Sequence, residues 1–216
     1  MENKLIAIVG MGPLISLSVA ERFAKEGYRI AMIARNEEKL KELKKHLNGQ
    51  GFEAEYFTGD ASSETSLRKT FAQIQSKMGD PDVLHYNAAK IKRSNLLEET
   101  ASSLTEDFKV NTAGALSAVK AVLPAMRQKN EGSILITGGG LSVDPHPEYG
   151  ALSVGKAAIR NFTHTLARSL KNTNIYVGTI IIRGFVKQGK EKYNPKDIAD
   201  LFWKMHQEKG PVEIEY

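Results

Sequence analysis

Two glycines that follow an apolar run are the first residues whose type and spacing could do chemistry. Residues 5–9 are all apolar, and Gly10 and Gly12 come directly after them. Glycine permits backbone angles that other residues avoid, so a glycine turn lets N–H groups approach a phosphate. A helix that begins near Ile15 adds the positive end of its dipole. Arg35, after the next apolar run, offers a planar charged donor for a second phosphate.

Apolar runs alternate with amphipathic stretches along the chain. Strands are expected at residues 4–9, 28–34, 52–58, 83–86, 133–137, 175–182 and 212–214. Helices are expected at residues 15–25, 37–47, 63–78, 104–128, 150–170 and 195–207. Several of the strands are apolar throughout, as parallel strands covered on both faces must be. The pattern predicts an α/β fold, with a doubly wound parallel sheet of the Rossmann type in one three-layer domain over residues 1–216.

The composition excludes several kinds of site and partner. The 216 residues include no cysteine, which excludes thiolate zinc sites, disulfides and a thiol nucleophile, and we expect no metal site. The net charge of +5 comes without an arginine-rich run, so we expect no nucleic-acid partner. No apolar run approaches the roughly 18–20 residues that span a bilayer, and no export signal stands before the first strand. We therefore expect no membrane partner and a cytoplasmic location.

The glycine turn resembles that of the short-chain dehydrogenase/reductase family. Gly10 matches the first of three glycines in the family's signature, whereas Leu14 and Ser16 stand at the second and third positions. Gly12 is an extra glycine inside a loop of unchanged length. Leu14 adds a side chain where the family's backbone approaches its cofactor. Two interpretations stay open: the turn is a weakened dinucleotide site, or it is a structural turn that binds nothing.

Further matches follow in the family's order over about residues 4–210. Asn87 and Ala88 follow the fourth expected strand, where the family has an Asn-Ala-Gly motif. The resemblance implies these further cofactor-binding residues: Asp60, Ala61, Lys156, Gly184 and Val186. No acidic residue ends the second strand to bond an adenosine ribose, so Arg35 favours NADP over NAD. The alternative is that Arg35 merely pairs with Glu37 or Glu38.

The resemblance also implies a catalytic helix that lacks its usual acid. Lys156 matches the family's lysine, and Asn111 matches a helix asparagine that holds a water linked to it. Four residues before Lys156, where the family has tyrosine, stands Leu152, and Gly139 occupies the family's serine position. Losing a positioned general acid typically costs about 10²–10⁴ in rate. Nearby side chains that could substitute are Tyr149, His146, Ser142 and Ser153. Tyr149 could equally be an ordinary half-exposed residue at the helix entrance.

The resemblance bears on the surroundings of the site as well. An atypical subgroup of the family shares the incomplete glycine signature, the absent tyrosine and a short C-terminal end, and residues 197–206 resemble its last helix. Residues 185–194 are short where the family has a longer substrate lid, so we expect an open pocket. By resemblance, the helices at 104–128 and 150–170 join subunits in a homodimer or homotetramer.

Basic residues gather in the segments after the expected strands. They either focus a positive potential that attracts phosphates or an acyl carrier, or they are scattered solvated side chains. The set consists of Arg35, Lys90, Lys92, Arg93, Arg183, Lys187 and Lys190.

Three functions remain open from the sequence. The first is an NADP-dependent oxidoreductase with a weakened active site that acts on an unknown carbonyl or alcohol, which Asn111 and Lys156 favour. The second is a catalytically inactive pseudoenzyme that binds a dinucleotide as a sensor or interaction module, which Leu14 and Leu152 favour. The third is a structural subunit that binds no nucleotide.

Overall fold

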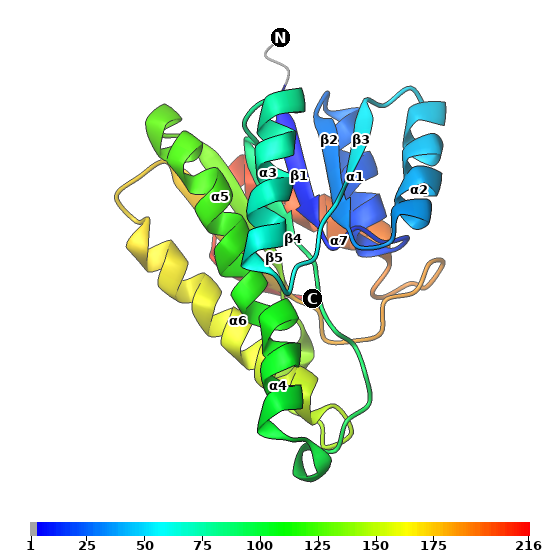
Figure 1. Cartoon of the computed structure of the whole chain (residues 1–216), viewed down its shortest axis with the longest axis vertical. Helices are drawn as coiled ribbons and strands as arrows, with labels where there is room; N and C mark the ends of the chain where they lie inside the picture. The colour runs from blue at the N-terminus through cyan, green and yellow to red at the C-terminus, as the bar shows by residue number, and fades with distance from the viewer. Residues whose placement is uncertain (1–3) are drawn as a thin grey trace.

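A parallel sheet of seven strands forms the middle layer of the structure (Figure 1). The computed structural model describes residues 4–216, and residues 1–3 of the expected domain lie outside the described part. The strand order is β3-β2-β1-β4-β5-β6-β7, and all neighbouring pairs are parallel. The strands are β1 Leu5–Val9, β2 Arg29–Ala34, β3 Ala54–Thr58, β4 Val83–Tyr86, β5 Gly132–Thr137, β6 Ile175–Ile181 and β7 Glu213–Glu215. The expected doubly wound α/β sheet is confirmed.

Helices cover both faces of the sheet, which explains why its central strands are mostly apolar. Every residue of β1, β4, β5 and β6 is buried. One face packs against α1 (Ile15–Lys25), α2 (Glu37–Gly49) and α7 (Pro195–Glu208). The other face packs against α3 (Glu64–Met78), α5 (Gly114–Lys129) and α6 (Gly150–Ser169). The core is therefore two apolar layers separated by the sheet.

Polar side chains at the helix entrances fix where several helices begin. Asn36 and Ser63 each accept a hydrogen bond from a backbone N–H in the first turn of α2 and α3. Thr100 and Ser103 form a capping box at the start of α4 (Ala101–Phe108). Because of this box, the helix expected from residue 104 begins at residue 101.

The stretch expected as one helix over 104–128 is interrupted. After α4, the chain makes a π-helical turn, η2 (Lys109–Ala113), before α5 begins at Gly114. The Tyr86 hydroxyl donates a hydrogen bond to the carbonyl oxygen of Val110 at 2.5 Å, and so satisfies an acceptor inside this turn. A Cβ atom at Gly114 would collide with the carbonyl oxygen of Ala61, so only glycine allows this close approach. π-Turns within helices frequently mark functional sites.

The strand order reverses between β1 and β4, and in open α/β sheets this is where ligands bind, beyond the carboxyl ends of the strands. At this end of the sheet, α4 and the first turns of α6 extend past the strands (Figure 1). Within residues 4–216, no helix combines the length and the apolar character that crossing a bilayer requires.

Candidate functional site

A cleft of about 1080 Å³ lies beyond the carboxyl ends of the central strands. The cofactor-binding residues expected from the sequence all line it: Gly10, Gly12, Ile15, Arg35, Asp60, Ala61, Asn87, Ala88, Lys156, Gly184 and Val186. Gly139, Leu152, Tyr149 and His146 line the same cleft. Asn111, Ser142 and Ser153 do not. One cleft therefore brings together the glycine turn and the helix that carries Lys156, and Asn111, Ser142 and Ser153 lie outside its lining.

Gly10 places the end of β1 directly against the segment that follows β4. Its φ is +84°, and a Cβ atom built on it would collide with the backbone nitrogen of Ala88. The N–H groups of Gly10 and Met11 both donate to the carbonyl oxygen of Ile33, at 2.9 and 3.0 Å. Glycine is thus required at position 10 for its backbone angle and for the close approach.

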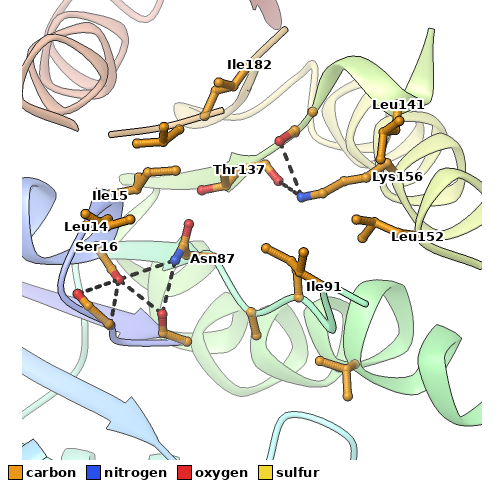
Figure 2. A pocket seen from close by; sticks show the side chains of 18 of the residues that line it. Leu14, Ile15, Ser16, Asn87, Ile91, Thr137, Leu141, Leu152, Lys156 and Ile182 are labelled. Atoms are coloured by element: carbon orange, nitrogen blue, oxygen red, sulfur yellow. Dashed lines mark hydrogen bonds between the residues drawn. The ribbon is translucent and has the colours of Figure 1, made fainter. Parts of the chain in front are cut away.

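Ser16 holds the glycine turn in shape. Its Oγ accepts the Gly12 N–H at 2.9 Å and donates to the carbonyl oxygen of Gly10 at 3.1 Å or of Gly12 at 3.3 Å. Nδ2 of Asn87 donates to the same Gly10 carbonyl at 3.1 Å and to Ser16 Oγ at 3.3 Å. Figure 2 shows these bonds, which we call the Ser16 clasp. The sequence comparison treated Ser16 as a missing glycine, and its bonding role was not foreseen.

The clasp leaves two N–H groups at the start of α1 available. Leu14 is the N-cap residue and provides no side-chain cap, and its side chain is 40% exposed at the cleft. Among residues 4–216, the N–H groups of Ile15 and Ser16 have no acceptor. Unpaired N–H groups at a helix N-terminus favour an anion through their direction and through the helix dipole.

Arg35 stands exposed at the end of β2 and lines the cleft. Within the described chain it makes no ion pair. Glu37 and Glu38 instead lie 3.3 and 2.9 Å from Nζ of Lys41 on the same helix. The structure therefore does not pair Arg35 with Glu37 or Glu38.

Lys156 projects from α6 to the carboxyl end of β5. Its Nζ donates to the carbonyl oxygens of Thr137 at 3.0 Å and Gly138 at 3.3 Å (Figure 2). Burial lowers the pKa of Lys156 to about 8, because the charged form loses hydration. Leu152, one helical turn earlier and only 6% exposed, adds an apolar surface beside the amine. The lysine is therefore half-buried, with two carbonyl acceptors for its N–H groups.

Asn111 lies in η2, behind the cleft wall. Its Oδ1 accepts the backbone N–H of Lys90 at 2.7 Å, while its buried Nδ2 has no acceptor among the described residues. A Cβ atom at Gly155 would lie 2.7 Å from Cβ of Asn111, so α6 packs closely on this turn. Asn111 thus fixes the segment after β4. The structure records no bond between Asn111 and Lys156 within residues 4–216.

Tyr149 and His146 stand at the mouth of the cleft. Tyr149 is the N-cap residue of α6, and its side chain raises the pKa of Arg93 by hydrogen bonding. His146 is exposed, and its Nδ1 accepts the N–H of Glu148 at 3.2 Å. The Ser153 hydroxyl donates to the carbonyl oxygen of Tyr149 at 2.9 Å. Tyr149, His146 and Ser153 are therefore engaged with one another or with residues at the rim. The buried Oγ of Ser142 has no hydrogen-bond partner among residues 4–216.

Four of the seven basic residues near the strand ends form ion pairs, which neither sequence interpretation foresaw. Lys90 and Lys92 reach the carboxylate of Asp107, at 2.5 and 3.1 Å, and Asp107 is only 1% exposed. Lys92 also lies 2.8 Å from Glu99. Two further pairs join Arg93 to Glu148 at 3.8 Å and Arg183 to Glu215 at 3.1 Å. The lysines neutralise a buried aspartate that sequence reasoning missed, because a single Asp in a helix is usually solvated.

Comparisons with known proteins agree with this architecture. Residues 4–197 match the family model described as short chain dehydrogenase. The chain is 31% identical over 176 residues to a 2,3-dihydro-2,3-dihydroxybenzoate dehydrogenase of Bacillus subtilis, which covers 81% of this chain and 67% of that protein. It is 29% identical over 202 residues to a human 3-oxoacyl-acyl-carrier-protein reductase, with 91% and 83% covered.

A solved structure extends the likeness to the whole fold. An alcohol dehydrogenase from the archaeon Thermococcus sibiricus, complexed with 5-hydroxy-NADP, superposes with a TM-score of 0.87 at 23% identity. The match covers 99% of this chain and 95% of that one. At this identity the likeness concerns the fold, and it confirms the arrangement of sheet and helices expected from the sequence.

Proposed function

Because this chain belongs to the short-chain dehydrogenase/reductase family, we propose that it binds NADP in the cleft and acts as an oxidoreductase on a carbonyl or alcohol, at a rate reduced by the absent tyrosine. One observation carries the proposal: the glycine turn, Arg35 and Lys156 line a single cleft. The cleft volume of about 1080 Å³ is slightly above the roughly 300–1,000 Å³ usual for small-molecule sites, so a dinucleotide and a small substrate have room.

The residues present fit the phosphates of a dinucleotide. The unpaired N–H groups of Ile15 and Ser16 suit a pyrophosphate at the start of α1. Arg35, which has no carboxylate partner among residues 4–216, suits the 2′-phosphate that distinguishes NADP from NAD. Two of the similar solved structures carry NADP or a derivative of it, which supports the same choice.

The residues at the other end of the cleft suit the sugar and the reacting carbonyl. Lys156 stands at this end of the cleft, where the nicotinamide would lie, and bound NADPH would supply the hydride. Leu152, Leu141 and Ile91 line the space in front of Lys156 and make it apolar (Figure 2). This surface suits an uncharged carbonyl compound.

A second candidate function rests on one specific position. Leu152 stands where the family's acid belongs, and a leucine can neither give nor take a proton. A pseudoenzyme that binds NADP as a sensor would keep the phosphate site and lose turnover. Cofactor binding without any carbonyl reduction favours this second function, whereas turnover favours the first.

Cofactor binding is tested by thermal unfolding with NADPH and with NADH. A ligand present at 100 times its Kd stabilises the folded state by about 2.7 kcal/mol, so the melting temperature should rise more with NADPH than with NADH. Arg35→Glu should weaken NADPH by about 10–100-fold, because hydrogen bonds to charged groups contribute about 1.5–3 kcal/mol. Lys45→Glu makes the same charge change at an exposed position of α2 away from the cleft, and should leave the preference intact. A melting temperature that neither cofactor moves would overturn the proposal.

A further inference from the structure

The groups of the cleft that could carry a proton lie at two depths. Tyr149 and His146 stand at the mouth, where they contact each other with ring centroids 5.9 Å apart. Lys156 lies deeper, at the end of β5 and beside Leu152 (Figure 2). Of these three groups, only Lys156 occupies the part of the cleft that the apolar residues enclose.

We propose that Lys156 itself donates the proton to the carbonyl oxygen during reduction, in place of a tyrosine. This inference rests on the proposed function. Bound NADPH would supply a hydride to the carbonyl carbon and would itself be oxidised to NADP. The C–O π bond would break and its electron pair would move to oxygen. One N–H bond of the Lys156 ammonium breaks as the O–H bond forms. The products are an alcohol and a neutral amine, which regains its proton from solvent.

The two carbonyl oxygens fix the direction of the proton that is transferred. Nζ of a lysine is tetrahedral, with one position taken by Cε. The carbonyls of Thr137 and Gly138 can only accept, so two N–H bonds point to them in both protonation states. The fourth position holds a hydrogen in the ammonium and a lone pair in the amine. It has no acceptor among residues 4–216, so it is the position that can exchange a proton with a substrate.

The surroundings make such an exchange possible near neutral pH. The charged or titratable groups on neighbouring elements stand along the lining of the same cleft: Arg93, Asp144, His146, Glu148, Tyr149 and Arg183. His85 lies behind Thr137 and bonds its hydroxyl at 3.0 Å. The lowered pKa of Lys156, about 8, comes from burial. A general acid works best when its pKa is close to the working pH.

Gly139 allows the lysine to reach this place. A Cβ atom at Gly139 would lie 3.3 Å from Cε of Lys156, which is tight for carbon atoms. The absent serine therefore leaves the lysine stem free to lie along the end of β5. Leu152 removes the phenol that would otherwise stand next to the amine. The two departures from the family pattern thus act on the same lysine.

The first test follows Lys156 without turnover. The protein is labelled with [ε-¹³C]lysine, and the Lys156 signal is assigned by its disappearance in Lys156→Met. Its chemical shift should titrate with a midpoint near pH 8. The signals of the other lysines provide the internal reference, since an unperturbed lysine side chain has a pKa of about 10.4. A Lys156 signal that titrates together with the other lysines would overturn the inference.

The second test follows the reduction of 9,10-phenanthrenequinone, a planar apolar diketone, at saturating NADPH. The rate should fall as pH rises through about 8, because deprotonated Lys156 has no proton to give. Lys156→Arg keeps the positive charge but does not titrate in this range, so NADPH should still raise its melting temperature while kcat falls by about 10²-fold or more. Tyr149→Phe and His146→Ala should each keep kcat within about threefold of the unmodified chain.

The outcomes separate this inference from the proposed function. Turnover that survives Lys156→Arg but is lost in Tyr149→Phe or His146→Ala overturns the role of Lys156 and leaves the oxidoreductase standing. NADPH binding with no reduction of the quinone also overturns the inference and favours the pseudoenzyme. The absence of any NADPH effect on melting overturns the proposed function, and the inference with it.

Discussion

A Cβ atom built on Gly139 would lie 3.3 Å from Cε and 3.4 Å from Cδ of Lys156. The lysine stem therefore occupies space that a side chain at position 139 would have to share. Its Nζ is held on the two carbonyls just before that position, those of Thr137 and Gly138. A serine at position 139 would therefore press on the lysine stem, and Lys156 would have to shift to make room for it.

Rebuilding the family's acid should raise turnover. We expect Leu152→Tyr combined with Gly139→Ser to increase the rate of phenanthrenequinone reduction at least tenfold, since a positioned acid contributes about 10²–10⁴ and Lys156 must shift by a few tenths of an ångström. Leu152→Phe with the same serine is the matched control, because it adds the ring without the hydroxyl. Equal rates in the two double variants would contradict the prediction.

Gly10 and Gly12 should respond very differently to a methyl group. Gly10 has a φ of +84° and no room for Cβ, whereas nothing lies within 4 Å of a Cβ atom at Gly12. Gly10→Ala should lower the free energy of unfolding by about 2 kcal/mol or more, since a strained backbone position alone costs of order 1–3 kcal/mol. Gly12→Ala should change it by less than about 0.5 kcal/mol. Urea denaturation measures both, and similar values for the two variants would refute the assigned role of Gly10.

Removing the Ser16 hydroxyl should loosen the glycine turn. In Ser16→Ala the Gly12 N–H and the Gly10 carbonyl lose their bonds to Oγ, and we expect a loss of roughly 1–2 kcal/mol in stability with weaker NADPH binding. Ser18 is buried in the same helix and its side chain makes no hydrogen bond among the described residues, so Ser18→Ala is the matched control. The test is the difference between the two variants in melting temperature with and without NADPH.

The buried carboxylate of Asp107 should make its lysine partners important for stability. Lys90→Met with Lys92→Met leaves this carboxylate buried and unpaired, and should cost about 3 kcal/mol or more. Lys109 pairs with Glu106 at 2.6 Å on the surface of the same region, so Lys109→Met should cost less than about 1 kcal/mol. Chemical denaturation at pH 7 compares them. A double variant as stable as the control would show that Asp107 is neutral or hydrated.

Acid should destabilise the fold through its buried histidines. Burial lowers the pKa of His85 to about 3, so the unfolded chain binds this proton first as pH falls below about 6.5. The stabilisation is complete above that pH, and it is lost towards pH 3 with a slope of up to about 1.4 kcal/mol per pH unit. Burial lowers the pKa of His206 to about 4, which acts in the same direction. In His85→Gln the free energy of unfolding should fall less steeply below about pH 6.5 than in the unmodified chain. The substitution of the exposed His146 by glutamine is the matched control and should not have this effect.

The sequence predicted the fold well, because strand and helix signals are local. The apolar runs placed all seven strands, and α1 begins and ends where its pattern predicted. The break at η2 was missed, since it depends on Tyr86 and Ala61, which lie far from it in the sequence. A local sequence pattern cannot indicate that the Tyr86 hydroxyl, on another strand, bonds this turn.

The site was predicted by position but not by interaction. Matching to the family pattern placed its cofactor-binding residues around one cleft, yet it treated Ser16 as a loss and Lys90 as a loop cation. Asn111 bonds the backbone of Lys90 through Oδ1, a partner that the sequence did not predict, and its expected water-mediated link to Lys156 stays a prediction. Such pairings depend on side-chain directions, which residue types and spacing do not fix. The expected homodimer or homotetramer stays a prediction.

The Ser16 clasp has a consequence for how quickly a ligand can be captured. Because Ser16 and Asn87 both hydrogen-bond the backbone of the glycine turn, the turn has its shape before any ligand binds. A ligand then meets a preorganised cradle and loses little affinity to loop ordering. Association is expected to be a rigid-body encounter in a single kinetic phase, and cutting the clasp should add a slow step without altering any group that touches the phosphates.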